Sequence, residues 1–160
     1  MSTPPIRPGG ASMTSSRPGT GAHRTLPSRA EVTERGAVLE REVVAALRAE
    51  QPELGEFTAR RPARDRNSGE EVAGIGTLVH VGELLAGDGA PDPGRVATRR
   101  LLSAADAAAA RHGMTGLRTT VCEGVLQGRW SRADGDELEL VIGVRVAVRV
   151  ISAPFLPRSR

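Results

Sequence analysis

The residues of this sequence best suited to chemistry are four arginines in the polar stretch RRPARDRNSGEE, residues 60–71. A guanidinium presents a planar fork of donors that matches the oxygens of a phosphate. The stretch supplies four candidate phosphate contacts: Arg60, Arg61, Arg64 and Arg66. Tyrosine is absent, and the aromatic side chains are Phe57, Trp130 and Phe155. Binding of a nucleic acid would therefore depend on its phosphate backbone and not on base stacking.

A second set of arginines accompanies a long alternation of apolar and polar residues near the end of the chain. A side-chain period of two is typical of a strand with one buried face. The apolar side is made by Leu138, Leu140, Ile142, Val144, Val146, Val148 and Val150. The opposite side carries Arg145, Arg149 and Ile151. Because arginine is enriched in protein interfaces, we predict these three residues as a candidate partner surface.

Carboxylates concentrate at one turn, where Asp134, Asp136, Glu137 and Glu139 lie close together in the chain. Paired carboxylates can do acid–base chemistry when a cleft holds them. A turn is normally solvated, so we interpret this group as an exposed polar turn without a catalytic role.

Two patterns that could hold a cofactor or a metal are incomplete. The segment Gly74-Ile75-Gly76 lacks the third glycine and the following helix of a dinucleotide-binding loop. The residues His80, His112 and Cys122 have no local spacing of zinc ligands. No nucleophile elbow, phosphate-binding loop or HExxH motif occurs. We therefore expect no cofactor, no metal site and no catalytic residues, and a protein that is not an enzyme.

Charge is distributed unevenly over the 160 residues. Residues 1–29 carry four arginines and no acid, whereas the remaining 131 residues carry 18 arginines and 19 acids. The basic balance therefore belongs to the N-terminal segment. Residues 1–28, rich in Pro, Gly, Ser and Arg, have little to bury and are predicted to be a disordered tail. Residues 29–157 are predicted to form a single α+β domain.

Cysteine usage and hydropathy bear on the location of the protein. Cys122 is the only cysteine, so no intrachain disulfide can form. The sequence has no apolar run long enough for a transmembrane segment. The N-terminus lacks the apolar core of a signal peptide, so as written the chain is expected to be cytoplasmic.

The hydrophobic periodicity predicts two helices and four strands, in the order helix, strand, strand, helix, strand, strand. The helices are expected at about 29–50, where Ser28 and Glu31 have the spacing of a capping box, and at 93–112. The strands are expected within 53–61, 74–87, 117–131 and 136–152, and the stretch 60–71 is expected to be an exposed loop.

The last two strands are predicted to form a hairpin around Ala133-Asp134-Gly135, with Gly135 in the left-handed conformation. This register sets three pairs opposite each other: Trp130 and Leu138, Leu126 and Ile142, and Cys122 and Val146. The predicted fold class is α+β, with two helices packed on one face of a four-stranded, mainly antiparallel sheet. The other face of the sheet is free.

The order of these elements, GMTG at 113–116 and the ending VRVISAPFLP at 148–157 resemble a group of small uncharacterised lipoproteins and secreted proteins of high-GC actinobacteria. In those proteins the final strand runs into Ser-x-Cys-x-x-Pro. Here no cysteine lies near Pro154, and the N-terminus carries no lipobox. The resemblance covers about residues 30–157. It implies a fold and a cell-envelope setting, and no catalytic residue.

Three classes of function stay open at this point. The leading hypothesis is a non-enzymatic module that binds a protein partner or forms a homo-oligomer through its sheet. The alternative is electrostatic binding of a nucleic acid through the arginine stretch and the basic tail. The third is an enzyme whose site is assembled from scattered residues.

Overall fold

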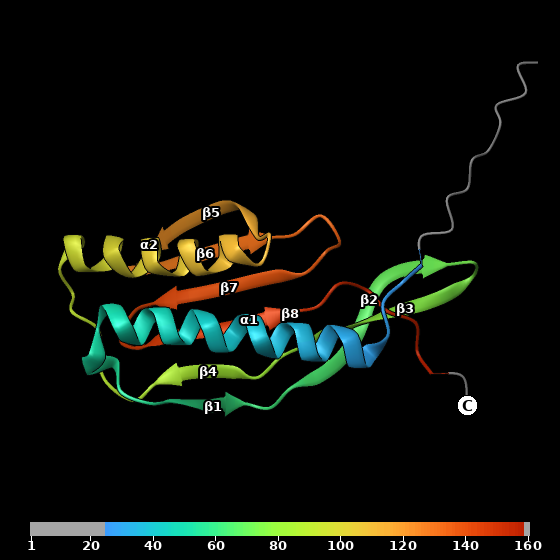
Figure 1. Cartoon of the computed structure of the whole chain (residues 1–160), viewed down its shortest axis with the longest axis horizontal. Helices are drawn as coiled ribbons and strands as arrows, with labels where there is room; N and C mark the ends of the chain where they lie inside the picture. The colour runs from blue at the N-terminus through green and yellow to red at the C-terminus, as the bar shows by residue number, and fades with distance from the viewer. Residues whose placement is uncertain (1–24, 159–160) are drawn as a thin grey trace, which may run out of the picture.

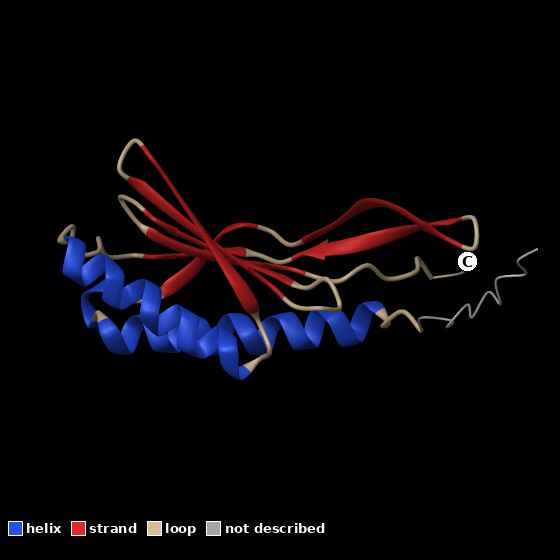
Figure 2. Cartoon of the chain, turned by 90° about the horizontal axis from the view of Figure 1, so that it is seen from above, coloured by secondary structure: helices blue, strands red, loops and turns tan. Residues whose placement is uncertain are grey.

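The computed structural model describes residues 25–158 and places two helices on one side of a twisted antiparallel sheet (Figures 1 and 2). Figure 2 shows the sheet from its edge, with both helices beneath it and no helix above it. The hairpin of strands β2 and β3 extends past the end of the helical layer (Figure 1). The predicted disorder of residues 1–28 concerns a segment that lies almost entirely outside the described residues.

Helix α1 runs over Arg29–Glu50, as predicted, and begins with the predicted capping box. The Ser28 hydroxyl accepts a hydrogen bond from the backbone N of Glu31 at 3.2 Å, and the Glu31 carboxylate accepts one from the backbone N of Ser28 at 2.6 Å. These bonds satisfy two amides that the first turn leaves free. The helix buries one face on the sheet through Val32, Leu39, Val43 and Leu47.

Helix α2 runs over Arg95–Arg111, slightly shorter than predicted. Its N-cap is Gly94, whose backbone N donates to the Asp92 carboxylate at 2.8 Å. Small side chains let this helix pack closely on its neighbours. Its buried residues are Leu101, Ala105, Ala108 and Ala109.

The sheet has eight strands, twice the predicted number. They are β1 Phe57–Arg61, β2 Arg64–Val72, β3 Ile75–Val81, β4 Leu84–Gly87, β5 Thr115–Cys122, β6 Val125–Ser131, β7 Glu137–Ile142 and β8 Val146–Ile151. A short 3-10 helix, η1 at Pro52–Leu54, occupies the start of the first predicted strand.

The four-strand prediction was wrong because tight turns interrupt the predicted segments. Glu123 and Gly124 have φ values of 51° and 79°, and Ala73 and Gly74 have φ values of 51° and 76°. Two consecutive residues of this kind form the two-residue turn that suits the twist of a hairpin. The turn at 123–124 divides one predicted strand, a turn at 143–145 divides another, and a break at residues 82–83 divides the predicted strand 74–87 into β3 and β4. The turn at 73–74 makes the predicted loop into β2.

Strand β8 is central to the sheet. One of its edges pairs with β7 along the whole strand, and the other pairs first with β4 and then, at Ile151, with Val81 of β3. Strands β3 and β4 therefore act as one strand that bends at Gly82 and Glu83. The overall order is β1-β4-β8-β7-β6-β5, with β2 paired to β3.

The register of the last hairpin is confirmed in its inner part. Trp130 pairs with Leu138 and Leu126 with Ile142, and Gly135 has a φ of 106° in the connecting turn. The third predicted pair, Cys122 with Val146, was wrong because both strands turn before reaching each other. Cys122 pairs with Val125 and Val146 with Ile142.

The predicted apolar row of the final strands forms the main core under the helices. Its buried members are Leu138, Leu140, Ile142, Val146, Val148 and Val150. Val144, which was predicted in this row, is 84% exposed because it lies in the turn between β7 and β8. Leu126 is partly buried against the same core.

Candidate functional site

The uncovered face of the sheet carries a row of charged side chains across four neighbouring strands. The register pairs Arg149 of β8 with Glu139 of β7, Glu139 with Arg129 of β6, and Arg129 with Arg118 of β5. Side chains at paired positions share a face. Since Val148, next to Arg149, is buried under the helices, the row lies on the side without helices.

One carboxylate in this row binds two of the three arginines. Glu139 accepts hydrogen bonds from Arg149 Nε at 3.0 Å and Arg149 Nη2 at 2.6 Å. Its other oxygen lies 2.8 Å from Arg129 Nη2. Arg118 is exposed and has no ion pair within residues 25–158. The row therefore carries an excess of positive charge.

Strand β2 adds two arginines of the predicted phosphate-contact stretch to the same face. Arg64 pairs with Val81 and Arg66 with Val79, and Val81 pairs with Ile151. Ile151 stands two residues beyond Arg149 in β8, so all of these side chains are on the uncovered side. Ile151 itself is 7% exposed and clusters with the two valines. This part of the predicted partner surface is buried within that small apolar cluster.

The other predicted arginines are placed less centrally. Arg60 forms an ion pair with Asp88 at 3.1 Å, and Arg61 pairs in register with Leu84 of β4. Arg145 is exposed in the turn between β7 and β8. The contact of these arginines with a phosphate or a partner stays a prediction.

The aromatic side chains do not contribute to the uncovered face. Trp130 and Phe155 are each 1% exposed, and Trp130 Nε1 donates to the Asp106 carboxylate on α2 at 2.7 Å. Phe57 packs against the main core. The face therefore presents guanidinium groups but no aromatic side chain on which a base could stack.

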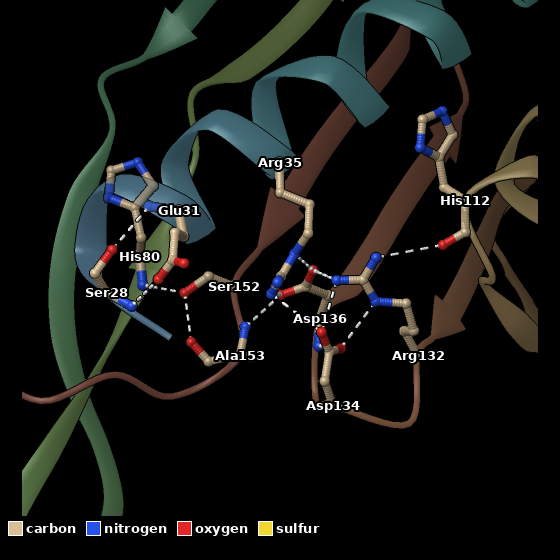
Figure 3. Close-up of polar contacts among 10 residues, drawn as sticks. All are labelled: Ser28, Glu31, Arg35, His80, His112, Arg132, Asp134, Asp136, Ser152 and Ala153. Atoms are coloured by element: carbon tan, nitrogen blue, oxygen red, sulfur yellow. Dashed lines mark hydrogen bonds and ion pairs between the residues drawn. The ribbon is translucent and has the colours of Figure 1, made fainter. Parts of the chain in front are cut away.

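The turn that we interpreted as solvated holds a buried carboxylate (Figure 3). Asp136 is 3% exposed and accepts hydrogen bonds from Arg35 Nε at 2.7 Å, Arg132 Nη2 at 2.6 Å and the Ala153 backbone N at 2.6 Å. The hydrogen bond from Arg132 lowers the pKa of the neighbouring Asp134. The interpretation of an exposed turn was wrong for Asp136, because α1 and the segment after β8 both pack on it.

The three residues considered as zinc ligands have separate partners. His80 Nδ1 lies 2.7 Å from the Asp65 carboxylate, and His112 Nε2 lies 2.7 Å from the Glu42 carboxylate. Cys122 is exposed at the end of β5. Within the described residues, no group of three or more His, Cys, Asp and Glu side chains is arranged to hold a metal ion.

Sequence reasoning missed Glu40, a carboxylate on the buried side of α1. Burial raises its pKa to about 7, and the nearby Glu83 carboxylate adds to the effect. A signal was present in the sequence, because Glu40 follows Val32 and Gly36 at intervals of four residues, the spacing of one helix face. A carboxylate within an apolar stripe indicates a site or a cleft.

Comparison with protein-family models and with curated proteins finds no match for this chain. Its fold does recur among solved structures. A DUF4853 family protein from Actinomyces odontolyticus matches with a TM-score of 0.58 and 13% identity, over 84% of this chain and 72% of the other. A candidate lipoprotein, LppA, from Mycobacterium tuberculosis matches with a TM-score of 0.45 and 12% identity, over 80% of this chain and 75% of the other.

The likeness to the Actinomyces protein confirms the predicted resemblance to actinobacterial proteins at the level of the fold. Neither likeness assigns a ligand or partner to this chain. Among residues 25–158, neither helix has the length and apolar character needed to cross a membrane.

Proposed function

We propose that this protein is a non-enzymatic binding module that docks an acidic surface of a protein partner on the uncovered face of its sheet. The observation that carries this proposal is the excess of positive charge on that face. Five arginines share it with two glutamates: Arg64, Arg66, Arg118, Arg129 and Arg149 with Glu137 and Glu139. Arginine is enriched in protein interfaces, where its fork of donors matches carboxylates.

The charge of the face favours a different protein over a second copy of this chain. In a symmetric dimer built through this face, the arginines of one copy would meet those of the other. Like charges brought together across an interface oppose binding. An acidic partner instead supplies the carboxylates that Arg118, which has no ion pair within residues 25–158, can bind.

A binding role is also consistent with the state of the carboxylates near this face. Glu139 is already held by Arg129 and Arg149, and Asp136 by Arg35 and Arg132. The oxygens of both carboxylates are thus engaged by guanidinium groups and are not free to act on a substrate.

Nucleic-acid binding is a second candidate, because the structure brings Arg64 and Arg66 onto the same face as Arg149. Contact would be limited to phosphates, since Trp130 and Phe155 are buried. The actinobacterial resemblance supports a cell-envelope setting, in which an acidic protein is the better occupant.

The test is the binding of a fluorescent decaglutamate peptide, followed by anisotropy at about 10 mM and about 150 mM salt, where the Debye length falls from about 30 Å to about 8 Å. Arg118→Glu combined with Arg129→Glu should weaken binding about tenfold or more, because like charges then face the peptide. The matched control is Arg95→Glu with Arg99→Glu, two exposed arginines of α2, which changes the net charge equally and should bind like the wild type.

Equal binding by the two double variants would contradict the proposed surface. A 20-base-pair duplex is the second probe. Duplex binding that persists at the higher salt while the peptide fails to bind would favour the nucleic-acid candidate. Light scattering should show a monomer, and a dimer that the Arg118 and Arg129 changes dissociate would favour self-association.

A further inference from the structure

A cleft lies on the opposite side of the sheet, between α1, the bend that joins β3 to β4, and the end of β8. Its volume is about 230 Å³. Two glycines let these elements come together. A Cβ on Gly36 would lie 3.3 Å from Val150 Cγ1, and a Cβ on Gly82 would lie 2.9 Å from the Val150 carbonyl oxygen. The floor of the cleft is therefore formed by backbone and by the Val150 side chain.

Most polar side chains that line the cleft already have partners (Figure 3 shows Ser152 and His80). The Thr33 hydroxyl donates to the Arg29 carbonyl at 2.8 Å. The Ser152 hydroxyl accepts from the His80 backbone N at 2.8 Å and donates to the Ala153 carbonyl at 2.7 Å. These groups have little capacity left for a ligand.

Two carboxylates in the cleft are different. Glu40 and Glu83 both line it and neither has a hydrogen bond or an ion pair within residues 25–158. The Glu40 carboxylate lies above Gly82, with Oε2 3.7 Å from the position of a Cβ there. No arginine lines this cleft, and the one histidine that lines it, His80, is bound to Asp65 and not to either of these groups.

The surroundings of Glu40 include other charged and titratable groups. A neighbouring groove that Glu40 also borders is lined by Arg41, Arg48 and Glu56. At the far end of the cleft, the His80 ring is bound to Asp65, which is in turn paired with Arg29 at 2.7 Å. Burial and the Glu83 charge together raise the pKa of Glu40 to about 7, so a cation placed between the two carboxylates would relieve their repulsion.

We propose that this cleft binds a small organic cation, an ammonium or guanidinium group on a short apolar stem. The charged head lies between Glu40 and Glu83, which accept its hydrogen bonds. The stem lies against Val32 and Val150, which line the apolar part of the cleft. The volume limits the stem to a few carbons. This site is separate from the arginine face and does not depend on the function proposed for it.

The experiment is calorimetric titration of the full chain with n-butylamine at about pH 8 and about pH 5.5, on either side of the Glu40 pKa. Binding should be saturable and tighter at the higher pH, where Glu40 is already ionised, because at the lower pH the head must displace a proton from it. The neutral isostere n-butanol and the anion butyrate should not bind. Glu40→Gln combined with Glu83→Gln should weaken n-butylamine about tenfold or more, because two charged hydrogen-bond acceptors are lost.

Two further variants keep the result interpretable. Glu34→Gln removes an exposed carboxylate of α1 outside the cleft and should bind like the wild type. Ala37→Leu fills the cleft without changing its charge and should abolish binding. Failure of n-butylamine to bind at pH 8, or equal binding of n-butanol, would overturn the proposal, as would unchanged affinity in Ala37→Leu.

Titration with a second ligand, lysine capped at both its amino and carboxyl ends, distinguishes the possible sources of the cation. Affinity equal to that of n-butylamine identifies a basic side chain of another protein as the occupant. Binding of n-butylamine alone identifies a free amine, because the cleft then excludes the peptide groups.

Discussion

Asp136 and Glu139 each bind two arginines, one just before strand β7 and one within it, and they serve different purposes. Asp136, just before β7, is held by Arg35 and Arg132 and is 3% exposed. Glu139, within β7, is held by Arg129 and Arg149 and faces the side without helices. The ion pairs of Asp136 join α1 to the hairpin, whereas those of Glu139 join neighbouring strands that are already hydrogen-bonded.

The difference shows how burial decides what an ion pair contributes. A buried carboxylate that loses its partners or its charge is costly, whereas an exposed pair contributes little to stability. Asp136 therefore fixes the fold at one end of the sheet. The arginines around Glu139 are more exposed than Asp136, at 62% for Arg129 and 26% for Arg149, so we expect their ion pairs to stabilise the fold less.

The largest expected effect separates the two faces of β7. Leu140→Ala, under the helices and fully buried, should reduce the free energy of unfolding by about 3–5 kcal/mol, because it leaves a cavity in the core. Val141→Ala, next to it on the uncovered face, should cost about 1 kcal/mol or less. Urea unfolding measures both, and comparable losses would mean that both faces are covered.

Asp136→Asn should reduce the free energy of unfolding by about 2–3 kcal/mol, since it weakens charged hydrogen bonds to Arg35, Arg132 and the Ala153 amide. Asp134→Asn is the control, because Asp134 binds the same two arginines from a more exposed position. It should cost less. A loss as large as that of Asp136→Asn would show that burial does not set the difference.

Glu40 should make stability depend on pH in the neutral range. Its pKa is raised from 4.5 to about 7 in the folded chain, so the folded state holds a proton more tightly than the unfolded state. Stability should therefore fall as pH rises from about 4.5 to about 7, by on the order of 1–2 kcal/mol after allowance for partial exposure. Thermal unfolding from pH 5 to pH 8 should show this slope, and Glu40→Gln should flatten it; an unchanged slope would contradict the assignment.

Glu139→Gln should have the smallest effect on stability, about 1 kcal/mol or less, because the arginines that it binds are partly exposed. The same urea titration measures it. A loss that matches Asp136→Asn would remove the distinction between the two carboxylates.

The fold class could be predicted from the sequence, because the hydrophobic periodicity indicates which face of each helix or strand is buried. The capping box at Ser28, the apolar row from Leu138 and the pairing of Trp130 with Leu138 depend on local patterns, and all appear in the structure. The number of strands could not be predicted from this periodicity. A turn such as Glu123-Gly124 divides a strand although the apolar alternation in the sequence continues through it.

The candidate sites were less predictable because they depend on contacts between distant segments. That Arg64 and Arg149 share a face follows only once β3 is known to pair with β8. Asp136 is buried because α1 packs on a turn that lies about a hundred residues away in the sequence. Glu40 is the exception, because its spacing from Val32 and Gly36 in the sequence already places it on the apolar face of α1.

The most direct test of the arginine face is the mapping of amide chemical shifts in the isotope-labelled protein during titration with decaglutamate at about 10 mM salt, where charge screening is weak. We expect the largest shifts in β5, β6 and β8, centred on Arg118, Arg129 and Arg149, with little change in α2. Shifts that centre on Arg95 and Arg99 of α2, or that spread evenly over all exposed arginines, would contradict a binding surface on the uncovered face.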